Sequence, residues 1–475
     1  MSRSLPNLTS VTTIGNDGSR RFLHPADVQG RFTVLRRVVA LLLIIFYAAL
    51  PWIQINGHPA VFLDATHLHF HFFGLTLASQ DLWLAFFLVT GLAFSLFYVT
   101  SFFGRVWCGW TCPYTVFLDH IFRRVERWID GDAPARRKME DAPWTAAKIF
   151  KRSLKHSIYL VLAAIIAHIF ISYFVSIPQL YAWMHHSPAQ HWFAFCAVTA
   201  ITGGLYFAFS WFREQFCIIM CPYGRLQSAL TDDNTVIIGY DKKRGEPRGK
   251  AGTEGAGDCV NCQRCVQVCP TGIDIRNGIQ LECIGCSACV DACDSIMVKL
   301  VRKPGLVRYD SLNGFNGGRT RFVRPRTIFY SVMALIGLAV FGLSLSTLNP
   351  MRVTATRMIG APFFVGDGLV RNQFNLRIIN KQNVPVKYSM KLDDAQGVRL
   401  GNEGLAIEVP ALHETTEPVI LTMPLSEYKT PIALRLLVSE QKPNGAVIMR
   451  EVEFIGPDKR MQNNDYLDPK KYLNR

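Results

Sequence analysis

The sequence has no cysteine in its C-terminal third: none of its thirteen cysteines follows Cys293. Disulfide bonds therefore cannot hold that region together. Twelve of the thirteen fall into four tight clusters. A disulfide-rich secreted protein is usually much shorter and spreads its cysteines differently. Clustered thiols in a chain of 475 residues indicate metal ligands.

Lysine and arginine are absent from two segments, 56–81 and 178–191, although the formal net charge is +15. The basic residues gather beside apolar runs, and no basic stripe interleaved with aromatics is present, which argues against nucleic-acid binding.

No cleavable signal peptide is recognised. The first apolar run follows a polar leader, and no small-residue cleavage site comes after it.

Five apolar runs each approach the roughly 20 residues that a helix needs to cross a bilayer. We predict membrane spans at Val38–Ile55, Leu82–Phe103, Ile158–Ile177, Trp192–Trp211 and Thr327–Leu348. Basic residues precede the first span and fill the segments between the second and third and between the fourth and fifth. The positive-inside rule then predicts a cytoplasmic N-terminus and a C-terminus on the outer side.

Beyond Pro350 the hydrophobic pattern changes to the period of two that is typical of strands. Turn residues separate six predicted strands: Phe374–Ile379, Val386–Leu392, Leu405–Val409, Pro418–Met423, Ile432–Val438 and Ala446–Phe454. We expect a small antiparallel, immunoglobulin-like β-sandwich that lacks the cysteine and tryptophan signature of antibody domains. No catalytic constellation is recognised in it.

These patterns predict five parts of the chain. They are a cytoplasmic N-terminal segment (1–37), a membrane domain with spans one to four (38–244), a cytoplasmic cysteine-rich domain (245–326), span five (327–348) and a periplasmic β domain (349–475). The Gly-rich stretch at 245–257 is expected to be a flexible linker. A phosphate-binding loop is disfavoured because no apolar strand leads into it.

The most specific motif is a doubled one in the cysteine-rich domain. Each half has the spacing C-x2-C-x2-C-x3-C, in which three thiolates bind one [4Fe–4S] cluster and the fourth binds the cluster of the other half. Zinc also binds CxxC pairs, but eight cysteines at this spacing without histidine favour iron. Two such clusters relay single electrons. The predicted ligands are Cys259, Cys262, Cys265 and Cys293 for the first cluster, and Cys283, Cys286, Cys289 and Cys269 for the second.

Two matching C-x3-C-P motifs each follow a predicted span by a few residues. If the helix continues, the i, i+4 spacing puts both thiols of a motif on one face, and the proline disturbs the helix just past the second thiol. Two such pairs can converge into a four-sulfur site at the membrane boundary. Such a site could hold copper(I) or a further iron–sulfur centre, or form a redox disulfide, because thiolates are soft ligands. The alternative without a functional site is that these are ordinary buried cysteines at helix ends. The candidate site residues are Cys108, Cys112, Cys217 and Cys221.

Histidines are concentrated in the two segments without lysine or arginine. The H-x-H-x-H run would align three imidazoles on one face of an extended segment, and imidazole suits copper. The interpretation we favour is that histidines and aromatics simply populate uncharged interfacial loops. The candidate copper ligands are His67, His69, His71, His185 and His186.

Together these residues resemble the CcoG/FixG/RdxA family of accessory proteins. The resemblance runs from about Arg31 to the β domain and is carried by GRVWCGWTCPYTVF, REQFCIIMCPYGRLQSAL and DCVNCQRCVQVCPTGIDIRNGIQLECIGCSACVDACDSIM. It implies a polyferredoxin of the bacterial inner membrane that reduces Cu(II) to Cu(I) for the assembly of cbb-type cytochrome c oxidase. The implied partners are membrane lipid, copper ion, an unidentified cytoplasmic electron donor, and copper-transport and oxidase-assembly proteins. An oligomer is compatible with the sequence.

Two other functions fit the same residues. One is a quinol-linked membrane polyferredoxin that feeds a periplasmic reductase; such proteins often lack an outer β domain. The other is a non-catalytic assembly scaffold, in which the β domain docks a partner and the clusters sense redox state. Spacing and composition alone do not point to copper, so all three remain open from the sequence.

Overall fold

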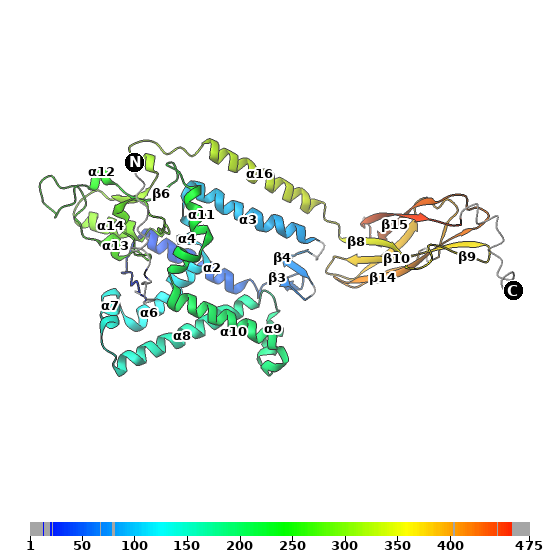
Figure 1. Cartoon of the computed structure of the whole chain (residues 1–475), viewed down its shortest axis with the longest axis horizontal. Coiled ribbons are helices and arrows are strands. Elements are labelled where there is room, and N and C mark those ends of the chain that lie inside the picture. The colour runs from blue at the N-terminus through cyan, green and yellow to red at the C-terminus, as the bar shows by residue number, and fades with distance from the viewer. Residues whose placement is uncertain are drawn as a thin grey trace, which may run out of the picture. The chain divides into compact units, whose positions relative to one another are not determined.

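The computed structural model describes residues 22–66, 68–77, 81–401, 404–443 and 445–457, together with Thr13 and Arg20, and omits the side chains at 82, 225 and 228 (Figure 1). The chain divides into two units. The first comprises Met1–Gln54, Pro59–Ala65 and Trp83–Gly342, and the second Ile55–His58, Thr66–Leu82 and Leu343–Arg475. Each unit is described by itself.

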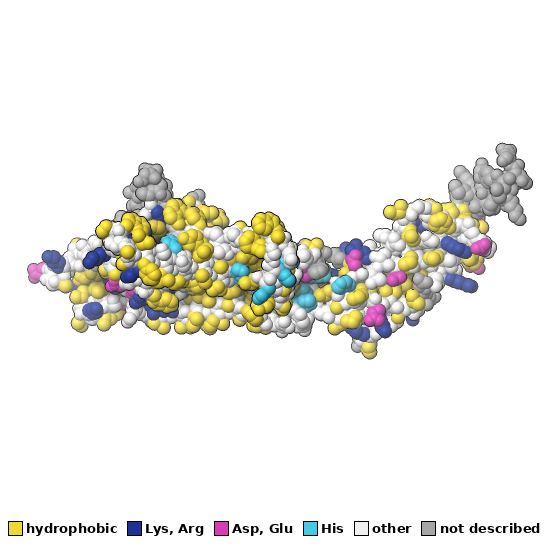
Figure 2. Space-filling model, turned by 90° about the horizontal axis from the view of Figure 1, so that it is seen from below, with side chains coloured by type: hydrophobic (Ala, Val, Ile, Leu, Met, Phe, Trp, Pro, Cys, Tyr) yellow, Lys and Arg dark blue, Asp and Glu magenta, His cyan; other side chains and the backbone are white. Residues whose placement is uncertain are grey.

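Within the described residues, five helices are long and apolar enough to cross a membrane. Their surfaces expose many large apolar side chains, which Figure 2 shows as yellow areas. Water would disfavour such surfaces, whereas the apolar interior of a bilayer accommodates them. A long apolar helix overlaps each of the five predicted spans. These helices are α2 (Arg31–Ala49), α3 (Leu82–Phe103), α8 (Ala146–Ile171), α10 (Trp192–Phe207) and α16 (Pro325–Ser346).

Two of these helices begin well before the predicted spans. Helix α2 begins at Arg31 because the carboxylate of Asp291 accepts hydrogen bonds from the backbone N–H groups of Phe32, at 3.3 Å, and Thr33, at 2.7 Å. These contacts satisfy donors that a helix N-terminus otherwise leaves unpaired. Helix α8 begins at Ala146, where Thr145 caps it by accepting from the N–H of Lys148. Hydropathy alone cannot detect such polar helix starts.

The cysteine-rich domain is built from two similar halves. Strand β6 (Ile237–Tyr240) pairs antiparallel with β7 (Val307–Asp310), and each half supplies one helix, α13 (Arg264–Gln267) or α14 (Ala288–Lys299). Apolar side chains from β6, β7 and α14 form a core in which the cysteines are embedded. The doubled sequence motif therefore produces a doubled structure.

Shorter elements connect these parts. In the first unit they are β3 (Val61–Asp64), α4 (Val106–Trp110), α5 (Pro113–Phe117), the π-helical turns η2 (Leu118–Phe122), η4 (Ala208–Phe212) and η5 (Phe216–Met220), α6 (Arg123–Asp130), α7 (Ala133–Asp141), α9 (Ile177–Met184), η3 (Pro188–His191), α11 (Pro222–Leu230), α12 (Lys242–Gly245), η6 (Ile275–Asn277) and α15 (Leu312–Phe315). Strands β4 (His69–Phe72) and β5 (Leu75–Leu77) belong to the second unit, and the two-residue strands β1 (Gln54–Ile55) and β2 (His58–Pro59) lie where the chain passes between units.

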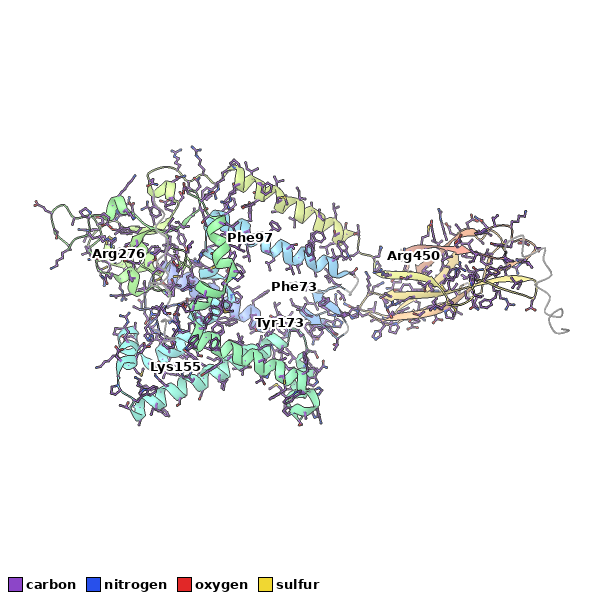
Figure 3. The ribbon with its side chains drawn as sticks, viewed as in Figure 1. Phe73, Phe97, Lys155, Tyr173, Arg276 and Arg450 are labelled. Carbon is purple, nitrogen blue, oxygen red and sulfur yellow. The ribbon has the colours of Figure 1, made fainter. Side chains whose placement is uncertain are left out.

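The second unit contains the predicted β-sandwich. One sheet has the order β12-β14-β10-β8, with β9 paired to β10, and the other has the order β13-β11-β15-β16. Arg450 of β16 donates to the carbonyl of Val353 in β8 at 2.6 Å (Figure 3). The strands are β8 (Met351–Arg357), β9 (Phe364–Gly366), β10 (Leu369–Asn380), β11 (Val386–Leu392), β12 (Arg399–Leu400), β13 (Ile407–Val409), β14 (Glu414–Pro424), β15 (Ile432–Glu440) and β16 (Val447–Phe454).

Three of these strands were not predicted: β8, β9 and β12. Strand β8 follows soon after α16; its residues MRVTATR alternate apolar and polar, and Met351 and Val353 are buried, so its period of two was present in the sequence and was overlooked. Strands β9 and β12 are too short to show a pattern. These two are recognisable as strands only through their pairing with neighbours.

Candidate iron–sulfur and thiol sites

Two small apolar cavities lie inside the cysteine-rich domain, and each is lined by one of the predicted ligand sets. The first is lined by Cys259, Cys262, Cys265 and Cys293, and the second by Cys269, Cys283, Cys286 and Cys289, with Cys265 at its edge. The fourth cysteine of each half therefore reaches the cavity of the other half, as the two-cluster ferredoxin arrangement requires. The structure brings the eight residues together in the predicted groups.

The loops around the two cavities have the same backbone conformation. Asn261 and Gln263 in the first half, and Gly285 and Ser287 in the second, all have positive φ angles between 54° and 69°. L-residues rarely adopt this conformation, so its repetition shows that both loops are shaped for the same purpose. Arg276, labelled in Figure 3, lines the first cavity and donates to the side chain of Asn261 at 2.7 Å.

The chemistry of these thiols fits a [4Fe–4S] cluster. Burial raises the pKa of Cys265 and Cys286 to about 11, and that of Cys283 and Cys293 to about 12. A bound cation reverses this effect because it stabilises the thiolate and replaces the proton. Backbone N–H groups of Gly285 and Ala288 also donate toward the sulfurs of Cys283 and Cys286, and such bonds tune cluster sulfurs.

No group of three or more His, Cys, Asp or Glu side chains in the described residues is placed to hold a single metal ion. A mononuclear zinc site needs its ligands gathered at bonding distance around one ion. A [4Fe–4S] cluster instead distributes its cysteines over separate irons, so its sulfurs stand farther apart. The doubled spacing of the cysteines and the exchange of the fourth cysteine between the two cavities favour iron–sulfur clusters over zinc.

The two C-x3-C-P motifs also share a backbone feature: a residue with a positive φ angle stands four positions before the first cysteine of each motif. Gly104, with a φ of 55°, stands four residues before Cys108, and Arg213, with a φ of 49°, stands four residues before Cys217. Each left-handed residue breaks the chain between a long apolar helix and the short turn that carries the first thiol. Arginine in this conformation is strained, so its position has to be held by the surrounding structure.

The conditional expectation of a continuous helix through each motif is wrong. Cys108 lies in α4 and Cys217 in the π-helical turn η5, but Cys112 and Cys221 are extended, with ψ angles of 121° and 112°. A proline disfavours the helical conformation of the residue before it. Pro113 and Pro222 therefore begin the next helices, α5 and α11, instead of disturbing an existing one.

The four thiols nevertheless converge. Burial, followed by the charges of Cys112 and Cys108, raises the pKa of Cys217. Burial likewise raises the pKa of Cys108 to about 11, against the opposing influence of Arg105. Gln227, which is fully buried, donates from Nε2 to the sulfur of Cys108 at 3.5 Å. We call Cys108, Cys112, Cys217 and Cys221 the thiol quartet.

Sequence reasoning did not identify Gln227 or Arg105 as site residues. Arg105 donates to the carbonyl of Gly224 and so joins the two motifs. The available signal was position: Arg105 precedes Cys108 by three residues, and Gln227 follows Cys221 by six. Neither spacing is distinctive without knowing that the two motifs meet.

The first motif rests directly on the loop of the second cluster. A Cβ atom added to Gly109 would lie 2.6 Å from the carbonyl oxygen of Ile284 and 2.8 Å from the backbone nitrogen of Cys286. Trp110 donates from Nε1 to the carbonyl of Gly285 at 3.3 Å. No side chain fits at Gly109. The backbone next to Cys108 of the thiol quartet is therefore in direct contact with the backbone of Cys286, which lines the second cavity.

A buried ion-pair network holds the strained Arg213. Its guanidinium binds both carboxylate oxygens of Glu126 at 2.9 and 3.3 Å. Glu214 binds Arg20 at 2.6 Å and Arg123 at 3.1 Å. Burial opposes ionisation of Glu126, but Arg213, Lys155 and other cations outweigh it and lower the pKa of Glu126 to about 2.

Replacing Glu126 by glutamine should destabilise the first unit by about 3 to 5 kcal/mol, because the buried Arg213 loses its two-bond carboxylate partner and keeps only Glu214, at 3.8 Å. The lowered pKa also predicts a pH dependence. The stability contributed by Glu126 is fully present above pH 4.5, its ordinary pKa, and is lost as the pH falls toward 2. Thermal unfolding in lipid nanodiscs measures both effects, and the variant should lack this part of the acid sensitivity. An unchanged melting temperature at pH 7 would contradict the assigned role.

Among the described residues, the candidates His69, His71, His185 and His186 form no metal site. His67 lies outside the described residues. His71 is buried and bonded to Thr76 at 2.9 Å, and its ring stacks on that of His58, with centroids 4.0 Å apart. His185 and His186 are exposed. The pairing of His58 with His71 comes from the fold of the loop and was not predicted.

Three family models match the chain. Residues 212–312 match the "4Fe-4S dicluster domain", residues 82–131 the "4Fe-4S binding domain", and residues 341–457 the "IG-like fold at C-terminal of FixG". The first two matches include all four residues of the thiol quartet as well as the eight cysteines around the cavities. The third confirms the immunoglobulin-like β domain.

The chain is 33% identical to Protein RdxA of Cereibacter sphaeroides, over 86% of this chain and 90% of that protein. It is 35% identical to Nitrogen fixation protein FixG of Rhizobium meliloti, over 76% of this chain and 77% of that protein. A solved structure of a FixG-related protein from Vibrio parahaemolyticus is 20% identical, with a TM-score of 0.21, and covers 24% of this chain and 99% of that one.

Apolar helices, two cysteine-lined cavities and the matching 4Fe-4S models together define a membrane-associated iron–sulfur protein that transfers electrons. Within that class, the chain belongs to the FixG/RdxA family.

Proposed function

We propose that this protein reduces Cu(II) to Cu(I) at the thiol quartet, and that the Cu(I) serves the assembly of a cbb-type cytochrome c oxidase. The observation that carries the proposal is the contact at Gly109, which places a four-thiol site against the backbone of a cluster-binding loop. Copper reduction consumes one electron per ion, and a bound [4Fe–4S] cluster supplies electrons singly.

The residues of the quartet suit the product of this reaction. Thiolates are soft ligands that favour Cu(I). Burial raises the pKa of Cys108 and of Cys217, so these two thiols are protonated and uncharged until a cation displaces their protons. Gln227 donates a hydrogen bond to Cys108 and fixes the direction of that thiol. The positive charge of Arg105 favours the thiolate form of Cys108.

The proposal includes a location. The chain spans the bacterial inner membrane several times, with the cysteine-rich domain in the cytoplasm and the β domain in the periplasm. The support is the distribution of lysine and arginine, which are absent from 56–81 and 178–191 and abundant on the other side of the apolar helices. A cytoplasmic donor then supplies the electrons, and copper-transport and oxidase-assembly proteins receive the Cu(I).

The test is a Cys217→Ser, Cys221→Ser double variant, purified anaerobically and reduced with dithionite. It should keep the iron of both clusters, about eight atoms per chain, but its reoxidation by Cu(II) should fall to the rate of non-specific background. Absorbance of the clusters follows the reaction. Cys196→Ser is the matched control, because Cys196 is an exposed cysteine within α10. If the double variant keeps its iron and reduces Cu(II) at the unmodified rate, the quartet is not the copper site.

A second function of the quartet is favoured by one observation: the "4Fe-4S binding domain" model covers Cys108 and Cys112. In this alternative the quartet holds a third iron–sulfur centre. Anaerobic metal analysis separates the two, because the alternative predicts about twelve irons per chain and the copper proposal about eight.

A further inference from the structure

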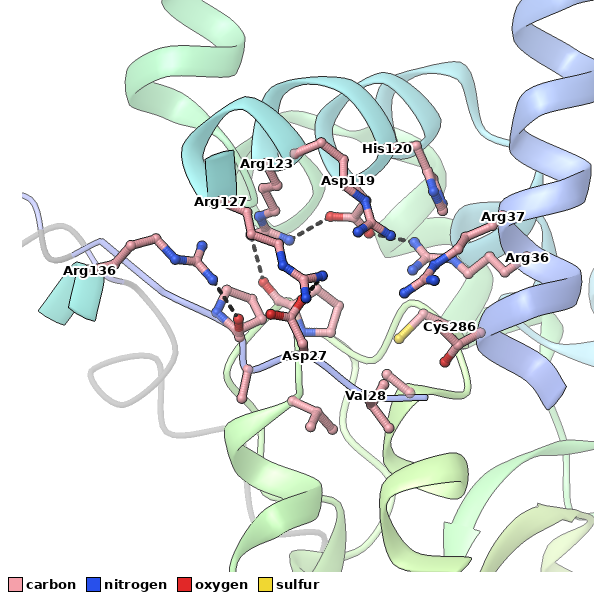
Figure 4. A pocket seen from close by; sticks show the side chains of 17 residues that line it. Asp27, Val28, Arg36, Arg37, Asp119, His120, Arg123, Arg127, Arg136 and Cys286 are labelled. Atoms are coloured by element: carbon pink, nitrogen blue, oxygen red, sulfur yellow. Dashed lines mark hydrogen bonds and ion pairs between the residues drawn. The ribbon is translucent and has the colours of Figure 1, made fainter. Parts of the chain in front are cut away.

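A cavity of about 120 Å³ lies beside the second cluster-binding loop and is unlike the apolar cavities around the thiols. Its volume accommodates about four water molecules. Helix α2, the segment from η2 to α7, and the loop of Cys286 surround it (Figure 4). The cavity is lined by six arginines: Arg36, Arg37, Arg123, Arg124, Arg127 and Arg136. We call it the arginine pocket.

Carboxylates in or near the arginine pocket form ion pairs with four of these six arginines. Asp119 binds both Arg36 and Arg123, the latter at 2.6 Å. Asp27 binds Arg127 at 2.7 Å. Arg136 lies 3.5 Å from Glu126, which Arg213 already engages with two hydrogen bonds. Each nearby acid is thus committed to at least one arginine.

Arg37 and Arg124 are left over. Neither forms an ion pair or a side-chain hydrogen bond with any residue that the structure describes, and the Nε atom of Arg37 is buried without a partner. The Nε atoms of Arg123 and Arg136 are buried and unpaired in the same way. In Figure 4 the guanidinium groups of Arg36, Arg37 and Arg127 point into the same space above Cys286. Unpaired donors that converge on a cavity indicate an absent acceptor.

The local electrostatics agree with this geometry. Burial and the like charges of Arg37 and Arg127 lower the pKa of Arg124. Burial and the same cluster of arginines lower the pKa of His120, at the edge of the pocket, to about 4. His120 is therefore neutral at pH 7 and adds no charge. The pocket has an excess of positive charge that its own residues do not offset.

We infer that the arginine pocket binds a phosphate group, held by the two uncommitted arginines, Arg37 and Arg124. The planar guanidinium fork matches the oxygens of phosphate and binds them with two parallel hydrogen bonds. Two unpaired cations suit the negative charge of a phosphate group, which is one on a lipid phosphodiester and close to two on a phosphate monoester at pH 7. A pocket of about 120 Å³ accepts a small anionic group rather than the face of an acidic protein. The group comes either from a soluble phosphate compound or from the headgroup of an anionic lipid, since α2 is one of the five apolar helices.

The test uses the full-length, iron-loaded protein in phosphatidylcholine nanodiscs, with inorganic phosphate as the probe at constant ionic strength. Ligand binding to the folded state raises the melting temperature by an amount that grows with the logarithm of the ligand concentration above the Kd. Phosphate should stabilise the unmodified protein and should have no effect on an Arg37→Gln, Arg124→Gln variant. Arg319→Gln, Arg321→Gln removes the same charge from two exposed arginines and should retain the response. Arg124→Lys keeps the positive charge but loses the planar guanidinium that forms two parallel hydrogen bonds. This variant should bind phosphate on the order of tenfold more weakly.

A second arm identifies the source of the phosphate. If a lipid headgroup fills the pocket, nanodiscs containing phosphatidylglycerol should abolish the response of the unmodified protein to inorganic phosphate. If a soluble compound fills it, the response should be the same in both lipids. Either result supports the pocket. Without phosphate, the Arg37→Gln, Arg124→Gln variant should melt no lower than the unmodified protein, because the change relieves repulsion between like charges.

Three results overturn the inference. The first is that phosphate and phosphatidylglycerol both leave the unmodified protein unaffected. The second is that the Arg319→Gln, Arg321→Gln control loses the response as fully as the pocket variant. The third is that the pocket variant unfolds at a lower temperature in the absence of phosphate, which shows that the two arginines serve the fold instead. None of these results depends on copper reduction, so the inference and the proposed function fail separately.

Discussion

Replacing Cys289 by serine should remove one iron–sulfur cluster and leave the other in place. Cys289 lines the second cavity together with Cys269, Cys283 and Cys286. Serine cannot supply the soft thiolate, so iron should fall from about eight to about four atoms per chain. Anaerobic metal analysis and electron paramagnetic resonance after dithionite reduction measure the loss. Because Cys289 belongs to the cavity beside the thiol quartet, reduction of Cu(II) should be abolished as well.

The exchange of cysteines between the two halves gives this prediction a sharper form. Cys269 belongs to the first half in sequence but lines the second cavity, whereas Cys293 belongs to the second half and lines the first. Cys269→Ser and Cys289→Ser should therefore remove the same resonance signal, and Cys293→Ser the other one. Cys196→Ser, the exposed control, should remove neither. If Cys269→Ser and Cys293→Ser remove the same signal, the ligand assignment is wrong.

Replacing Gly109 by alanine should disconnect the thiol quartet from the second cluster without removing iron. The added methyl group would lie 2.6 Å from a backbone oxygen and 2.8 Å from a backbone nitrogen, and backbone atoms cannot rotate away as a flexible side chain does. The two loops must separate. Electron transfer slows as the donor and the acceptor move apart, so reoxidation of the clusters by Cu(II) should be slower than in the unmodified protein.

Gly91 in α3 supplies the matched control, because a Cβ atom there meets nothing within 4 Å. Gly91→Ala should reoxidise at the unmodified rate. Both variants should contain the same amount of iron. Equal iron content would show that the slower reoxidation of Gly109→Ala comes from the lost contact between the loops and not from a lost cluster. Full activity of Gly109→Ala with full iron content would show that electrons do not pass through this contact.

The spacing of the cysteines along the chain determined most of the iron–sulfur chemistry. Three thiols at C-x2-C-x2-C can wrap only one cluster, so the fourth must come from elsewhere, and the repeat leaves only the other half. Apolar length likewise determined the five long helices, and the period of two determined six of the strands in the β domain. These properties are local or repetitive, so a single chain displays them directly.

The tertiary structure decided the features that depend on residues far apart in the chain. Asp291 sets the start of α2 from 258 residues away. Gly109, Gln227 and Arg105 become site residues only when the two motifs meet the second cluster loop. Arg37 and Arg124 become a binding site only because Asp27 and Asp119 are already paired with other arginines. The sequence determined which atoms can bind iron, because ligand chemistry belongs to each side chain. Which groups touch, and which charges remain unpaired, depends on packing across the whole chain, and only the folded structure shows it.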